Sequence, residues 1–123
     1  MSDDARLLIA TAVSSVLEEV PALRPLKLVV GFDMRGRGDT QMFRLELPSV
    51  TVTKDLATDA RIRVDMQRAF FNTMVEHDSK FADWREAFMY GQAKATGNPQ
   101  FLKLIATVVE KQEERNRLRR SRS

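Results

Sequence analysis

The spacing of apolar residues changes twice along the chain, and this change limits the fold more than any other feature of the sequence. Between Ala5 and Val20, apolar residues recur every three or four positions, which predicts an amphipathic helix. Pro21 and Pro25 end that pattern. A helix with a single apolar face has to pack on a larger element, so the rest of the chain must supply one.

From Leu28 onward, apolar and polar residues alternate, which is the period of a strand with one buried face. The alternation covers residues 28–35, 43–47, 50–53 and 60–64, and Gly36 to Asp39 has the composition of a hairpin turn between the first two segments. Short successive strands, each with one polar face, predict an antiparallel sheet.

Helical spacing returns at Met66 and continues past residue 75. A further short helix is predicted to begin at a capping box formed by Asp83 and Glu86. Residues 92–96 predict a fifth strand, and Asn98 predicts the start of the last helix. These elements predict one α+β domain over residues 1–110, without an internal repeat or linker.

Positive charge is concentrated at the C-terminal end. The whole chain has a net charge of +3 and a sequence pI of about 9.6. Residues 111–123, the basic tail, carry six cationic and two anionic side chains, whereas residues 1–110 have a net charge of −1. The cationic residues of the tail are Lys111, Arg115, Arg117, Arg119, Arg120 and Arg122. We expect the tail to be partly helical or disordered and to suit an anionic membrane surface. Nucleic acid is a weaker candidate, because no aromatic residues stand among the arginines.

The residues that most enzymes need are scarce. The chain has no cysteine, and His77 is its one histidine, which excludes thiolate and multi-histidine metal sites. No serine lies in a Gly-x-Ser-x-Gly motif, so we expect no catalysis, no metal and no cofactor. The lack of cysteine suits a reducing compartment, and the start MSDDARLL lacks the basic residues of a signal peptide. We therefore expect a cytoplasmic protein that can be peripheral to a membrane.

The chain contains seven phenylalanines and five internal methionines. These side chains suit an ordinary core, in which methionine fills irregular gaps, and they equally suit a deformable apolar pocket. Composition alone leaves both interpretations open.

The segment AFMYGQAKATGN, followed by an apolar helix, resembles the closing segment of the sterol-carrier-protein type 2 lipid-binding family. The matching residues are Ala87, Phe88, Met89, Gly91, Lys94, Gly97 and Asn98. The order of the earlier elements is similar too, so the resemblance covers residues 3 to about 109. It implies a five-stranded, mainly antiparallel sheet covered on one face by helices, with a hydrophobic tunnel between them.

The resemblance also implies which residues line the tunnel. From the sheet they are Phe32, Met34, Phe43, Leu45, Ile62 and Val64. From the helices they are Phe70, Phe71, Met74, Trp84, Phe88, Met89, Ile105 and Val109. Trp84 stands where the family often has proline, and its ring is expected at the tunnel mouth or over the core. Ala93 and Ala95 stand where the family usually has leucine or isoleucine, which leaves volume to be refilled or to become cavity.

Two functions follow from the resemblance. The first is a non-catalytic carrier that holds a sterol, fatty acid or acyl-CoA-like ligand in the tunnel. The alternative is a family-like scaffold with a closed interior that acts as a protein-interaction module. A continuous cavity between sheet and helices would favour the carrier, and a filled interior would favour the module.

Overall fold

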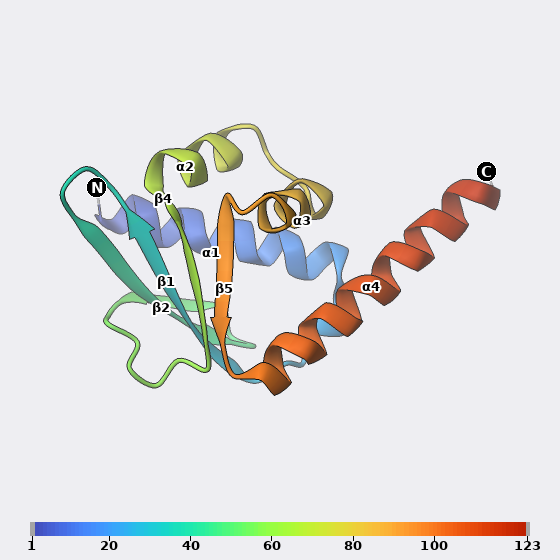
Figure 1. The fold of residues 1–123 in the computed structure, drawn as a ribbon, viewed down its shortest axis with the longest axis horizontal. Coiled ribbons are helices and arrows are strands. Elements are labelled where there is room, and N and C mark those ends of the chain that lie inside the picture. The colour runs from blue at the N-terminus through green and yellow to red at the C-terminus, as the bar shows by residue number, and fades with distance from the viewer. Residues whose placement is uncertain (1, 123) are drawn as a thin grey trace.

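The chain forms a sheet with helices packed on one of its faces, as seen in a computed structural model that describes residues 2–122 (Figure 1). The helices are α1 (Ser2–Glu19), the 3₁₀-helix η1 (Pro21–Leu23), α2 (Arg68–Glu76), α3 (Phe81–Met89) and α4 (Pro99–Arg122). The strands are β1 (Leu28–Arg35), β2 (Thr40–Leu47), β3 (Thr51–Lys54), β4 (Ile62–Gln67) and β5 (Ala93–Gly97). The α+β class, the five strands and their predicted order are confirmed.

The sheet has the strand order β3-β2-β1-β4-β5 and is mostly antiparallel, as expected. The pair formed by β1 and β4 is the exception, because these strands run parallel, with Phe32 opposite Val64. The connection after β3 carries the chain past β2 to the far side of β1, so β4 joins the sheet beside β1. The prediction of helix from Met66 was wrong by two residues, since Met66 ends the buried row of β4 and α2 begins at Arg68.

One face of the sheet carries the core. Alternate side chains along β1, β2 and β4 are buried, and they pack with the apolar stripe of α1, which crosses the strands in Figure 1. Phe43 and Ile9 are fully buried members of this core. The period-two and helical patterns of the sequence therefore describe the two sides of a single apolar layer.

Arginine–carboxylate pairs cover the opposite face of the sheet. The Arg63 guanidinium donates to both Asp33 carboxylate oxygens, at 3.2 and 3.0 Å, and to the carbonyl oxygens of Leu56 and Ala57. The Asp33 carboxylate raises the pKa of Arg63. Since residues 56 and 57 belong to the connection between β3 and β4, this arginine ties that connection to the centre of the sheet.

Side-chain hydrogen bonds mark the N-terminal ends of α3 and α4. Asn98 Oδ1 accepts the backbone N–H groups of Gln100 and Phe101, at 2.9 and 3.4 Å, which confirms the predicted N-cap of α4. The predicted capping box of Asp83 and Glu86 was wrong. Asp83 is the third residue of α3 rather than its cap, and its carboxylate accepts the N–H of Lys80 at 2.9 Å.

Helix α4 continues from the last strand through the basic tail as far as Arg122 and projects beyond the other elements (Figure 1). Gln112 is buried near the middle of this helix, and the Glu113 carboxylate pairs with Arg85 of α3. Beyond Asn116 the side chains described, through residue 121, are exposed. Within residues 2–122, no helix is long and apolar enough to cross a membrane.

Candidate ligand-binding cavity

An apolar cavity of about 430 Å³ lies between the inner face of the sheet and the helices. Its floor is formed by β1, β2 and β4, with a contribution from Ala95 of β5. Its walls come from α1, the segment around η1, and helices α3 and α4. Phe71 is the α2 residue in the lining. This volume lies within the usual range of small-molecule sites, and an apolar lining is what such sites require.

Nine of the fourteen residues predicted to line a tunnel lie in the cavity wall. They are Phe32, Leu45, Ile62, Val64, Phe71, Trp84, Phe88, Ile105 and Val109. They come from six different elements, so the fold brings together residues that are up to 77 positions apart in the sequence.

The other five predicted residues lie outside the wall. Met34 and Phe43 are buried in the core, and Phe70 and Met74 pack partly buried against it. Helix α2 lies against the ends of β1 and β4, where Met34 pairs with Met66, and of these two methionines only Met66 reaches the described cavity lining. Met89 is the last residue of α3 and is 60% exposed.

The prediction missed the wall that α1 contributes. Ile9, Ala12, Val13, Val16 and Leu17 face the cavity from successive turns of this helix. Their apolar stripe is visible in the sequence, but the same stripe is equally expected of a helix packed directly on the sheet. Nothing in the spacing of these residues distinguishes a wall from a filled contact.

The two positions singled out by their departure from the family pattern differ in the structure. Ala95 lines the cavity, whereas Ala93 is buried in the core and lies outside the lining. Trp84 is also in the wall, with 8% of its surface exposed, and its ring lies 5.9 Å from that of Phe71. Trp84 therefore joins α3 to α2 along the cavity.

Among the residues that the structure describes, Arg85 is the single ionisable one in the lining. The lining is almost wholly apolar, so Arg85 contributes mainly its hydrocarbon stem, as long cationic side chains often do. Its guanidinium turns to Glu113 of α4, and the two side chains are 39% and 31% exposed. The charged group of the described lining thus lies in a partly exposed side chain.

His77 and the facing carboxylates of Asp33 and Asp65 lie outside the cavity. His77 is exposed at the C-terminal end of α2, outside the cavity. Asp33 and Asp65 face each other across β1 and β4, but each is paired with an arginine on the outer face of the sheet. Among the described residues, no group of three or more His, Cys, Asp or Glu side chains could hold a metal ion.

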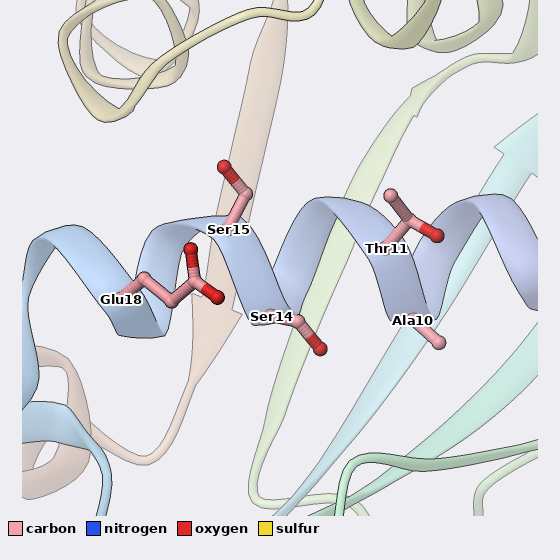
Figure 2. A pocket seen from close by; sticks show the side chains of 5 residues that line it. All are labelled: Ala10, Thr11, Ser14, Ser15 and Glu18. Atoms are coloured by element: carbon pink, nitrogen blue, oxygen red, sulfur yellow. The ribbon is translucent and has the colours of Figure 1, made fainter.

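A second, shallow hollow runs along α1 and is lined by Ala10, Thr11, Ser14, Ser15 and Glu18 (Figure 2). All five side chains come from this one helix, and the Thr11 hydroxyl already donates to the carbonyl of Leu7. No second element faces this hollow with a binding group, so the cavity between sheet and helices is the candidate site.

No protein-family model matches the chain, and no curated protein matches its sequence. Solved structures do match it. Sterol carrier protein domain 2 of Helicoverpa armigera superposes with a TM-score of 0.56 at 14% identity, over 87% of this chain and 84% of that one. The palmitated SCP2L2 structure from Aedes aegypti superposes with a TM-score of 0.53 at 12% identity, over 79% and 93% of the two chains.

A separate crystal structure of sterol carrier protein 2 like 2 from Aedes aegypti gives a TM-score of 0.52 at 12% identity, over 80% of this chain and 96% of that one. These structures are similar along most of their own length and over about four fifths or more of this chain. The chain therefore has the fold of a sterol carrier protein 2 domain.

Proposed function

We propose that the protein is a non-catalytic lipid carrier that holds one long-chain ligand in the cavity between sheet and helices. The observation that carries the proposal is an apolar cavity of about 430 Å³ whose described lining contains a single ionisable residue. A sterol, a fatty acid or an acyl-CoA-like molecule has the apolar body that such a lining suits.

The energy of chain burial is sufficient for useful affinity. Each buried methylene contributes about 0.8 kcal/mol, so a fourteen-carbon chain offers on the order of 10 kcal/mol before the costs of ordering the complex. This margin is enough for micromolar or tighter binding. No covalent or ionic bond to the protein is needed for that affinity.

The structural neighbours support the same choice. One of them is an SCP2L2 protein determined in palmitated form, and its fold superposes on most of this chain. The alternative, a protein-interaction module with a closed interior, gains no support from a cavity of this size. We therefore retain the carrier as the proposed function.

The basic tail supports a second part of the proposal, docking of the loaded carrier on an anionic membrane surface. The tail continues the helix that forms one wall of the cavity, and its side chains beyond Asn116 are exposed as far as they are described. With a net charge of +4, the tail contributes at most about 4 kcal/mol at such a surface.

The carrier proposal is tested by filling the cavity. An Ala95→Phe variant places a ring in the cavity from the edge strand, and Ala82→Phe adds the same ring at an exposed position of α3 as the matched control. We expect native mass spectrometry to detect lipid on the wild-type protein purified under native conditions and on Ala82→Phe, and to detect little on Ala95→Phe. Palmitate should raise the melting temperature of the same two proteins.

A wild-type protein that carries no lipid and shows no thermal shift with long-chain ligands would refute the carrier. Equal loading of Ala95→Phe and Ala82→Phe would place the ligand outside this cavity.

A further inference from the structure

We propose that Arg85 is the binding site for an anionic lipid head group, and that Glu113 competes with the ligand for it. This inference rests on the proposed carrier function and adds the chemical class of the ligand, a long-chain molecule with a carboxylate or similar anionic head. In the ligand-free protein Glu113 occupies the position that the head group takes when the ligand is bound.

The cavity lining determines where a charged head group can lie. An anion buried without a partner pays a large desolvation cost, and the lining apart from Arg85 consists of uncharged, almost wholly apolar residues. Arg85 is therefore the partner that the described lining offers to an anionic end, while the chain lies among the apolar residues. Arg85 is suited to this position because its stem lines the cavity while its guanidinium lies at the boundary with solvent.

The present partner of Arg85 shows which chemistry it binds. Arg85 Nε contacts Glu113 Oε1, a buried carboxylate oxygen that makes no hydrogen bond, and Arg85 Nη1 donates to Met89 Sδ at 2.6 Å. Glu113 lies one helical turn beyond Val109, the α4 residue nearest to it in the cavity lining. The Glu113 carboxylate therefore already contacts Arg85 at the end of the cavity wall. The head group of a fatty acid is also a carboxylate.

The carboxylate of the ligand can replace that of Glu113 on Arg85 without burying an additional charge. The Glu113 side chain is 31% exposed, so after release it reaches water by rotating its own bonds. Because one ion pair replaces another, the exchange itself changes the free energy little. Glu113 therefore masks the affinity of Arg85 for anions, and removing its charge reveals that affinity.

The experiment compares palmitate with 1-hexadecanol, which has the same chain length and no charge, in equilibrium titrations at low ionic strength. We expect Glu113→Gln to raise the affinity for palmitate about 10-fold, as one charge-assisted hydrogen bond becomes available, and to leave the affinity for hexadecanol unchanged. The double variant Glu113→Gln/Arg85→Met should lose the whole gain. Glu114→Gln, the adjacent and exposed carboxylate of α4, makes the same change in net charge and should bind both ligands like the wild type.

The outcomes separate this inference from the function it rests on. If Glu113→Gln leaves palmitate affinity unchanged, or raises it equally for hexadecanol, Arg85 is not a head-group site although the protein is still a carrier. The same conclusion holds if the double variant keeps the gain or if Glu114→Gln reproduces it. If the wild type and Glu113→Gln bind neither ligand, both the carrier function and the head-group site are wrong.

Discussion

Arg63 connects three parts of the protein through a single side chain. Its guanidinium binds the Asp33 carboxylate and two backbone carbonyls, and it lies so close to Gly31 that a Cβ at this glycine would be 3.0 Å from Cζ of Arg63. A neighbouring pair on the same face, Arg35 with Asp65, is more exposed and lacks the carbonyl contacts. The two pairs therefore have the same chemistry and different surroundings.

At this scale we predict that Asp33→Ala destabilises the protein by about 1–3 kcal/mol, because it leaves the partly buried Arg63 without its counter-charge. Asp65→Ala, which breaks the more exposed pair, should cost less than about 1 kcal/mol. Urea unfolding monitored by circular dichroism measures both. Equal losses would show that Arg63 has no larger role than a surface ion pair.

Individual residues also show how far the sequence can predict the candidate site. The alternation around Phe32 and Val64 identifies which side chains point inward, and the structure agrees. It does not distinguish Phe32, which faces the cavity, from Met34, which faces a filled part of the core. That difference depends on which part of the sheet α2 covers. The alternation of the sequence gives only the inward or outward direction of each side chain, so it cannot predict the position of α2.

The connection between β5 and α4 leaves no room for a side chain at Gly97. Gly97 has a φ of +131°, and a Cβ there would lie 2.3 Å from the carbonyl oxygen of Arg61, which also accepts the N–H of Asn98 at 2.8 Å. The last strand can thus turn directly into the helix that forms a cavity wall because this residue has no side chain.

We predict that Gly97→Ala costs about 2–5 kcal/mol, the sum of a left-handed backbone penalty and a clash with rigid backbone. Gly38→Ala is the matched control, since Gly38 has a φ of +76° and no atom within 4 Å of an added Cβ. It should cost about 1–2 kcal/mol. Thermal unfolding of the two variants gives the comparison, and a smaller loss for Gly97→Ala than for Gly38→Ala would contradict the assigned role of this connection.

The elements themselves are more predictable than their pairing. Pro21, Asn98 and the turn at 36–39 mark ends that the structure confirms. The parallel pairing of β1 with β4 leaves no mark in the sequence, because a strand with one buried face has the same period whichever direction its neighbour runs. The pairing is set by the path of residues 55–61, which Arg63 and Arg44 hold against the outer face through Leu56, Ala57 and Asp59.

At the scale of the whole molecule, α4 joins part of the cavity wall and the basic tail in one continuous helix. Its first part supplies Leu102, Ile105, Ala106 and Val109 to the cavity, and its last part is the described portion of the basic tail. Arg115 and Arg119 are exposed on that last part. Contact of the tail with a surface would therefore hold the cavity in a set orientation to that surface.

We predict that neutralising Arg115 and Arg119 together with glutamine weakens binding to vesicles rich in phosphatidylserine by about 30-fold, given roughly 1 kcal/mol for each charge near an anionic surface. The variant Lys27→Gln/Lys54→Gln removes the same charge from exposed positions outside α4 and should bind nearly as well as the wild type. Vesicle co-sedimentation measures both. Equal losses would mean that net charge, and not the tail, determines docking.

The central position of β1 has a consequence for the order in which the protein can be completed. This strand needs β2, which follows it within a few residues, and β4, which ends at Gln67. A nascent chain that has emerged only through β3 therefore has a hairpin whose inner edge, next to Val30 and Phe32, is unpaired and apolar. β1 gains its second neighbour only when β4 is complete, after more than half of the chain has been synthesised, and until then this edge of β1 is open to pairing with other chains.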